Sequence, residues 1–195
     1  MHSKIKLITQ IAIFAAVAAV VMVLDFPLPF FPPFYKLDFS EVIILISGFA
    51  FGILPAIFIE AGKVLLSFLL NGTQTMGIGE LANFLMGCSF IIPATFLYHR
   101  KKTKLNAIIG MGIGIFSLCI TASVLNYFIL LPIYANAFHM PMETLIAIGS
   151  AINPNIENLF GFILLAVVPF NLLKGIVTSI TVLFIYKKIT HILKK

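Results

Sequence analysis

An amide and an ammonium lie three residues apart in VVPFNLLKG, residues 167–175. Asn171 and Lys174 therefore share one face of a helix, near the middle of an apolar stretch where polar groups are costly and commonly mark function or pairing. Asn171 can donate and accept hydrogen bonds and Lys174 can donate them, so together they suit a heterocycle with an imide edge. Alternatively they are a structural pair, with Lys174 bound to carbonyl groups of a neighbouring helix.

A carboxylate and an amide show the same spacing in GIGELANFLMG, residues 77–87. Glu80 and Asn83 lie on one helix face at the expected outer start of an apolar span, although Glu80 in the first turn would also stabilise the helix dipole. Asn126 is a third candidate, because a buried amide needs hydrogen-bond partners. It can equally hold two helices together.

Glu60 and Lys63 are spaced for an ion pair within one helix. They lie near a tight turn that we expect at Pro55. We therefore interpret them as a structural pair rather than as part of a binding site.

The elements that carry these residues are apolar enough for lipid to be their solvent. Of the 195 residues, 61% are hydrophobic and 10% are charged, with a mean hydropathy of +1.11, whereas a soluble domain is about half apolar and about a quarter charged. Each crossing of a bilayer needs about 20 apolar residues. We predict an all-α membrane protein, a single integral domain over residues 1–195 that forms a bundle of six transmembrane helices. Their approximate bounds are 5–25, 39–54, 56–70, 80–98, 105–131 and 157–186.

The first apolar run is expected to be a permanent helix. It is longer than the roughly 7–15 residues of a signal-peptide core, and no clear cleavage site precedes Asp25. Four prolines, Pro27, Pro29, Pro32 and Pro33, exclude a continuous helix between the first two spans. Residues 132–155 are expected to form a long loop that can carry a short helix around residues 143–150.

The basic residues predict the orientation of the bundle. Ten of the thirteen lysines and arginines occur in three clusters, and an excess of basic residues marks cytoplasmic segments. Six crossings place all three clusters on one side, so we predict that both termini are cytoplasmic, and we attribute the basic clusters to topology and lipid contact rather than to nucleic-acid binding. The clusters are Lys4 and Lys6; Arg100, Lys101, Lys102 and Lys104; and Lys187, Lys188, Lys194 and Lys195. The other side carries Asp25, Asp38, Glu41, Glu80, Glu143 and Glu157, with Lys36 as its one base.

Motifs for catalysis are missing from the sequence. It contains no phosphate-binding loop, no GxSxG, HExxH or CxxC motif, and its four histidines are scattered. Cys88 and Cys119 lie in apolar runs as small hydrophobes. Gly110 and Gly114 form a GxxxG face that predicts close helix packing. No catalytic residue, metal site or cofactor is predicted.

The polar candidates converge on the predicted outer half of the bundle, together with the aromatic first loop. An apolar cavity with a few fixed polar groups and a lid is typical of a small-molecule site. The predicted binding residues are Asn171, Lys174, Asn126, Glu80, Asn83, Tyr35 and Phe39.

The first span carries a smooth stripe of small residues. Ala12, Ala16 and Ala19 recur at helical spacing, which lets another helix approach closely. That helix belongs either to this chain or to a second membrane protein.

Three segments and the alanine stripe resemble the substrate-binding S-components of energy-coupling-factor (ECF) vitamin transporters, and specifically the riboflavin-binding members of that family. The segments are FPLPFFPPFYKLDFSEV (26–42), GELANF (79–84) and PFNLLKG (169–175), and the stripe is AIFAA (12–16). The similarity spans essentially the whole chain, including the six-helix layout.

The resemblance implies capture of riboflavin from outside a bacterial cell. Asn171 and Lys174 would hold the isoalloxazine ring with help from Asn126, and Glu80 and Asn83 would lie close to the ligand. It also implies association with a membrane coupling protein (the T-component) and two cytoplasmic ATPases, because the chain itself has no ATP-binding motif. The alternatives are an S-component for another vitamin or planar heterocycle, a membrane-embedded enzyme that uses Glu80 and His139, and a purely structural subunit.

Overall fold

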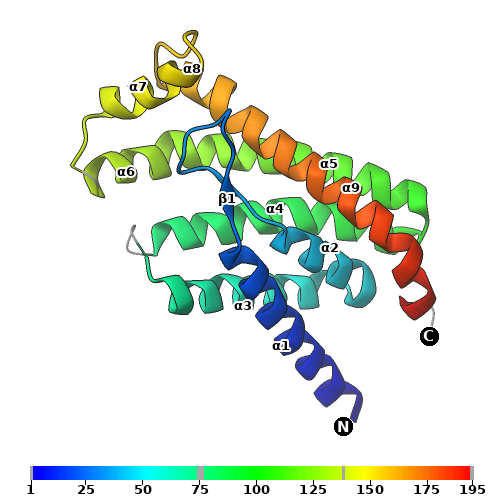
Figure 1. Ribbon diagram of the computed structural model, residues 1–195. Helices are drawn as coiled ribbons and strands as arrows, with labels where there is room; N and C mark the ends of the chain where they lie inside the picture. The colour runs from blue at the N-terminus through cyan, green and yellow to red at the C-terminus, as the bar shows by residue number, and fades with distance from the viewer. Residues whose placement is uncertain (1, 74–76, 138, 194–195) are drawn as a thin grey trace.

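The computed structural model describes residues 2–73, 77–137 and 139–193 and is almost entirely helical (Figure 1). Two-residue strands pair antiparallel in the first loop, with Phe26 opposite Leu37. The elements are α1 (His2–Val23), β1 (Phe26–Pro27), β2 (Lys36–Leu37), α2 (Ser40–Phe51), α3 (Ile53–Asn71), α4 (Ile78–Arg100), α5 (Lys104–Leu125), the π-helical turn η1 (Asn126–Leu130), α6 (Leu131–Ala137), α7 (Met142–Ile152), α8 (Leu159–Phe162), the π-helical turn η2 (Ile163–Val167) and α9 (Val168–Leu193).

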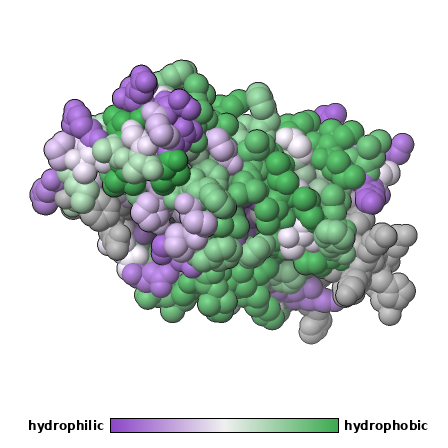
Figure 2. Space-filling view, turned by 45° about the horizontal axis from the view of Figure 1, so that its top comes forward, coloured by the Kyte–Doolittle hydropathy of each residue, from purple (hydrophilic) through white to green (hydrophobic). Residues whose placement is uncertain are grey.

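Five helices in the described part of the chain are long and apolar enough to cross a membrane. Large hydrophobic side chains remain exposed on them, for example Phe116 at 68% and Phe184 at 77%. Hydrophobic residues cover most of the face seen in Figure 2. The prediction of an all-α membrane protein is confirmed. The five helices span Lys4–Val23, Ile53–Asn71, Ile78–Arg100, Lys104–Ala137 and Leu159–Ile185.

The break between α2 and α3 differs from our expectation. It lies at Gly52, whose φ of 100° favours glycine, and not at Pro55. Pro55 is the third residue of α3, where its missing N–H costs nothing because the first turn has no intrahelical acceptor for it. The predicted turn was therefore wrong by three residues.

The predicted loop beginning at Pro132 is also wrong. Helix α5 continues through η1 into α6 as far as Ala137, and the Leu131 N–H donates to the carbonyl of Asn126 across the wider turn. A proline inside an α-helix loses a hydrogen bond and collides with the carbonyl four residues earlier. The π turn η1 lies just before Pro132 and shifts the hydrogen-bonding pattern from the fourth to the fifth preceding carbonyl. The π turn η2 lies just before Pro169 in the same way. The short helix expected around residues 143–150 is present as α7.

Close packing of α4 on α5 depends on glycine. A Cβ at Gly110 would lie 2.8 Å from the carbonyl oxygen of Ala94, and one at Gly114 would collide with the carbonyl of Phe90. These approaches confirm the helix-packing interpretation of the GxxxG face.

The alanine stripe of α1 divides between two faces. Ala15 and Ala19 are 4% and 1% exposed, and a Cβ at Gly62 of α3 would lie 2.9 Å from that of Ala15. Ala12 and Ala16 are exposed. Ala19, which we had grouped with Ala12 and Ala16, therefore packs inside this chain. Of the three predicted docking residues, Ala12 and Ala16 remain accessible to a partner.

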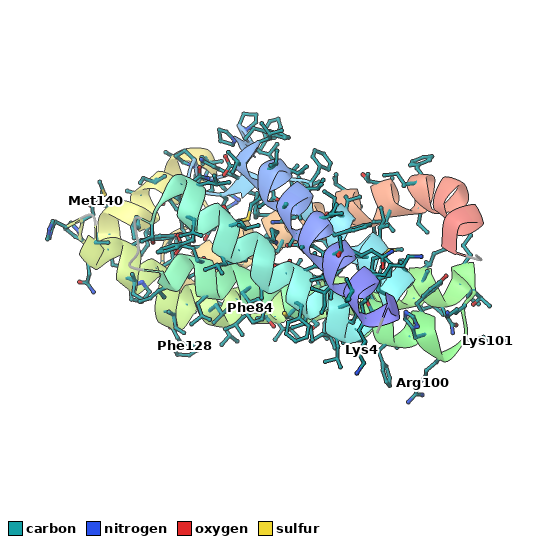
Figure 3. All side chains as sticks on the ribbon, turned by 90° about the horizontal axis from the view of Figure 1, so that it is seen from below. Lys4, Phe84, Arg100, Lys101, Phe128 and Met140 are labelled. Carbon is teal, nitrogen blue, oxygen red and sulfur yellow. The ribbon has the colours of Figure 1, made fainter. Side chains whose placement is uncertain are left out.

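Basic residues gather at one end of the bundle. Figure 3 shows Lys4, Arg100 and Lys101 at the same end and Met140 at the opposite end. The two chain ends also lie at one end of Figure 1. Lys194 and Lys195 of the third basic cluster lie outside the described residues.

Candidate functional site

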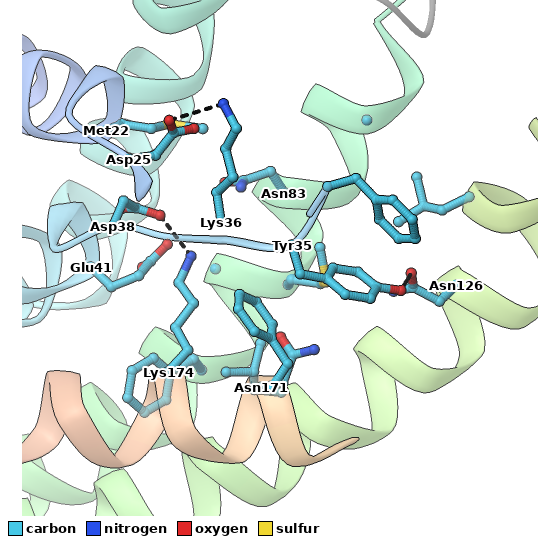
Figure 4. A pocket seen from close by; sticks show the side chains of 18 of the residues that line it. Met22, Asp25, Tyr35, Lys36, Asp38, Glu41, Asn83, Asn126, Asn171 and Lys174 are labelled. Atoms are coloured by element: carbon cyan, nitrogen blue, oxygen red, sulfur yellow. Dashed lines mark hydrogen bonds and ion pairs between the residues drawn. The ribbon is translucent and has the colours of Figure 1, made fainter. Parts of the chain in front are cut away.

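A cavity opens where the first loop, α4, η1 and α9 meet (Figure 4). It encloses about 200 Å³ and adjoins a second hollow of about 330 Å³ with which it shares lining residues such as Lys36 and Asn83. Together they fall in the range of about 300–1,000 Å³ that is typical of small-ligand sites. The polar side chains of the cavity are Asp25, Tyr35, Lys36, Asp38, Glu41, Asn83, Asn126, Tyr134, Asn171 and Lys174. Its apolar walls include Phe34, Met86, Phe90, Leu118, Leu130 and Phe170.

Five of the seven predicted binding residues line this cavity: Asn171, Lys174, Asn126, Asn83 and Tyr35. Glu80 lines the adjoining hollow and accepts a hydrogen bond from Thr73 at 3.0 Å. Phe39 is not among the lining residues. It is 38% exposed, and its ring centre lies 6.5 Å from that of Phe26.

Two asparagines are fixed at the π turns. The Asn126 amide donates to the carbonyl of Ala122 at 2.8 Å, and the Asn171 amide donates to that of Val167 at 2.9 Å. π-helical turns occur frequently at functional sites. Each asparagine is thereby oriented by its own helix.

The side-chain oxygens of the two asparagines differ in their hydrogen-bond partners. Tyr35 donates to the Asn126 Oδ1 at 2.8 Å, whereas no described residue donates to the Asn171 Oδ1. Tyr35 also stacks on Phe170, with ring centres 5.2 Å apart. The aromatic first loop and α9 thus form a flat apolar wall beside an available amide.

The other end of the cavity is charged. The Lys174 Nζ donates to the Asp38 Oδ2 at 2.9 Å, and the Asp38 Oδ1 accepts from the backbone and side chain of Ser40. The alternative in which Lys174 binds helix carbonyls is wrong, because its partner is a carboxylate. Burial opposes the charged form of Asp38, but Lys174 and Lys63, with the hydrogen bonds from Ser40 and Lys174, hold the pKa of its carboxyl well below its usual value.

A second buried ion pair lies behind the first. Glu60 and Lys63 pair at 2.8 Å as predicted, and Lys63 also donates to the Glu41 Oε1 of α2 at 2.8 Å. Glu60 and Lys63 have no exposed surface. A Cβ at Gly87 would lie 2.6 Å from the Glu60 Cδ, so the glycine allows α4 to close over these carboxylates.

Sequence reasoning missed five polar residues of the cavity, and two of them, Asp38 and Glu41, are deeply buried. The five are Asp25, Lys36, Asp38, Glu41 and Tyr134. From the sequence, Asp38 and Glu41 were placed on the non-cytoplasmic side without a binding role, and the structure buries them at 5% and 4% exposure. Their spacing of three residues around Ser40, at the start of an apolar helix, is the signal that was available. A buried lysine in each of two other helices requires such partners.

The mouth carries a third ion pair, between Lys36 and Asp25 at 3.1 Å. It is partly exposed and links the end of α1 to β2. Within the described ranges, no group of three or more histidines, cysteines, aspartates or glutamates is placed to hold a metal ion.

A larger hollow of about 490 Å³ lies between the first loop and the α7–α8 region. Its lining contains one amide, Asn153, and no charged side chain. It lacks the convergent polar groups that fix a ligand's orientation, so the cavity at Asn171 and Lys174 is the candidate site.

Comparison with known proteins matches this architecture. The family described as "ECF transporter, substrate-specific component" matches residues 6–186. The riboflavin transporter RibU of Staphylococcus aureus is 36% identical over 197 residues, covering 100% of this chain and 95% of that protein. The riboflavin transporter FmnP of Bacillus subtilis is 30% identical, covering 95% and 93%.

A solved structure described as the S component of a bacterial ECF transporter superposes with a TM-score of 0.76. It is 33% identical in sequence, over 98% of this chain and 99% of that one. The family consists of transporter components, so the prediction that this chain is not an enzyme is confirmed. The chain belongs to the substrate-specific components of ECF transporters.

Proposed function

We propose that this protein binds riboflavin at the cavity beside Asn171 and Lys174 and delivers it for ATP-driven uptake. The observation that carries the proposal is the meeting of a fixed amide, an ammonium and a stacked aromatic wall in one cavity of a membrane bundle. Full-length similarity to two riboflavin transporters supports the choice of ligand. Riboflavin is then the transported ligand and not a cofactor.

The cavity suits the two chemical halves of a flavin. The amide of Asn171 retains an acceptor and a donor for the imide edge of the isoalloxazine ring, and Lys174 can donate to a ring carbonyl or nitrogen. Asn126 assists through its bond to Tyr35, and Asn83 lies close by. Phe170 and Tyr35 offer aromatic surface against which a planar ring packs.

The charges of the cavity favour an uncharged ligand. Both lysines that line it, Lys36 and Lys174, are already paired with aspartates. A phosphorylated flavin would have to compete for those cations and would also face Glu41. Neutral riboflavin meets no such cost.

The membrane arrangement is part of the proposal. We place the chain as one integral domain of six crossings in a bacterial cell membrane, with both termini cytoplasmic. The sixth crossing would be α2, whose 12 residues span about 18 Å as a helix and are mostly buried by other helices. The common end of Lys4, Arg100 and Lys101 supports this orientation (Figure 3).

The energising partners are a membrane T-component and two cytoplasmic ATPases. The exposed Ala12 and Ala16 of α1 offer a smooth face on which a helix of the T-component can dock closely. Ala19 is excluded from that contact because it packs inside the chain.

The test is an absorbance spectrum of the protein purified in detergent, followed by titration with riboflavin. We expect flavin bands, a one-to-one stoichiometry, and sharply weaker binding for Asn171→Ala and Lys174→Ala in protein that remains folded. Unchanged affinity in both variants would refute the site. Displacement of bound flavin by a different vitamin or planar heterocycle at lower concentration would instead favour an S-component with another ligand.

A further inference from the structure

One buried charge cluster of this chain holds more carboxylates than ammonium groups. The Lys63 Nζ lies 2.8 Å from the Glu41 Oε1 and 2.8 Å from the Glu60 Oε1. We call these three side chains the buried trio, because Lys63 and Glu60 have no exposed surface and Glu41 is 4% exposed. If all three groups are ionised, the trio carries one negative charge in the interior of a membrane bundle.

No other cation among the described residues is available to neutralise that charge. The groups that act electrostatically on Glu60 are Glu41 of α2, Lys63 of α3, Cys88 of α4 and Lys174 of α9. Lys174 is already bound to Asp38 at 2.9 Å, and that pair is neutral in itself. Helix α1 meets α3 through Ala15, and its described lysines, Lys4 and Lys6, are exposed.

Glu60 is the carboxylate of the trio that is less able to remain ionised. Both of its oxygens are buried and accept no hydrogen bond from a described residue, whereas Lys63 donates to Glu41. A Cβ at Gly87 would lie 2.6 Å from the Glu60 Cδ, so the backbone of α4 covers this side chain. Glu41, by contrast, lines the cavity, where Figure 4 shows it near Lys174.

A buried carboxyl without a counter-charge of its own takes up a proton, because the desolvation cost of its charged form is too high. A second carboxylate at the same lysine has the same effect, since like charges in one site oppose each other's ionisation. The protonated carboxyl of Glu60 has one O–H donor. Glu41, which is held by the same lysine, is an acceptor for it.

We propose that Glu60 is a buried proton-binding site that holds its proton at neutral pH, so that the buried trio carries no net charge. This inference does not depend on the proposed function, because it involves no ligand. In the unfolded chain, an exposed glutamate is ionised above about pH 4.3. The folded chain therefore binds one more proton here at neutral pH, and a rise in pH favours unfolding. The folding equilibrium constant should decrease about tenfold per pH unit until Glu60 releases its proton.

The first test is the infrared difference spectrum between the wild type and Glu60→Gln at neutral pH. The protein is free of riboflavin and purified in a maltoside detergent, because flavins and ester lipids have carbonyl groups that absorb near a protonated carboxyl. We expect one protonated-carboxyl band that Glu60→Gln loses. Glu143→Gln is the control, since that glutamate is exposed and its difference spectrum should lack the band. A wild type and a Glu60→Gln variant that show no such difference overturn the inference.

The second test is the melting temperature of the same ligand-free samples. Glu60→Gln keeps the shape and neutrality of the protonated carboxyl, so we expect it to melt as the wild type does at neutral pH. Its melting temperature should then fall less than that of the wild type as the pH is raised. Glu41→Gln is the matched control, because the same change there removes the acceptor of the Lys63 hydrogen bond, and it should melt below Glu60→Gln. The opposite order would place the proton on Glu41 and overturn the inference.

Discussion

Breaking the pair between Asp38 and Lys174 is the perturbation whose outcome follows most directly from the structure. The two atoms lie 2.9 Å apart, and the side chains are 6% and 13% exposed. Asp38→Asn removes the charge but keeps an oxygen that can accept from Ser40, so the variant isolates the ion pair. Lys174 is then a buried ammonium without its partner.

The expected loss is large. Removing one partner of a buried ion pair costs about 3–5 kcal/mol of folding free energy. The 13% exposure of Lys174 lets its ammonium move toward water, so the lower end of that range applies, about 3 kcal/mol. For a chain of this size, 1 kcal/mol shifts the melting temperature by about 2–4 °C, which gives a decrease of about 6–12 °C.

The assay is thermal unfolding in detergent without riboflavin, so that ligand binding does not contribute. Asp25→Asn is the matched control, because it breaks the partly exposed pair with Lys36, and such pairs contribute at most about 1 kcal/mol. The double variant Asp38→Asn with Lys174→Met should be more stable than Asp38→Asn alone, since no charge is left stranded. The reasoning is refuted if Asp38→Asn has the same melting temperature as the wild type. It is also refuted if the double variant has a lower melting temperature than Asp38→Asn.

Three further predictions concern the cavity, the helix contacts and the docking face. Tyr35→Phe removes the phenol that donates to the Asn126 Oδ1 at 2.8 Å, and it should reduce the binding free energy of riboflavin by about 0.5–1.5 kcal/mol in a fluorescence titration. Unaltered affinity would show that this hydrogen bond does not help to form the site. Gly114→Ala should lower the melting temperature, because its Cβ meets the backbone of α4, whereas Gly112→Ala, with open space around it, should not lower it; equal melting of the two variants would contradict the packing argument. Ala16→Leu should abolish co-purification with the T-component and leave riboflavin binding intact, whereas Ala19→Leu should destabilise the isolated chain, since that alanine is 1% exposed; retained co-purification of Ala16→Leu would remove α1 as the docking face.

The sequence alone predicted the parts of the fold that depend on apolar length and on charge. A helix that crosses a bilayer needs a long apolar run, so the long helices can be predicted from such runs in the sequence. The turn at Gly52 was missed because Pro55 is a stronger signal of a break, although proline is tolerated in a first helical turn. The continuation of α5 through Pro132 was missed because a π turn has no sequence signature of its own.

The candidate site was predicted in part for a similar reason. Asn171, Lys174 and Asn126 are polar residues in apolar helices, and such residues are conspicuous. Asp38 and Glu41 sit next to a proline-rich loop, where carboxylates are ordinary. Only the three-dimensional packing of that loop against α9 and α3 shows that they are buried.

The turn η1 also sets the rotational phase of everything that follows it. A π turn accommodates one residue more than the same rise of α-helix, and each residue advances an α-helix by about 100°. Converting the turn to regular α-helix with all its residues kept would therefore rotate Tyr134, which lines the cavity, to a different side. Deleting one residue from 126–130 would instead remove the extra residue and leave Tyr134 facing the cavity. Helix α5, which precedes the turn, would keep its orientation in both cases. This single turn therefore divides one long helix into two segments whose side chains can face different surroundings.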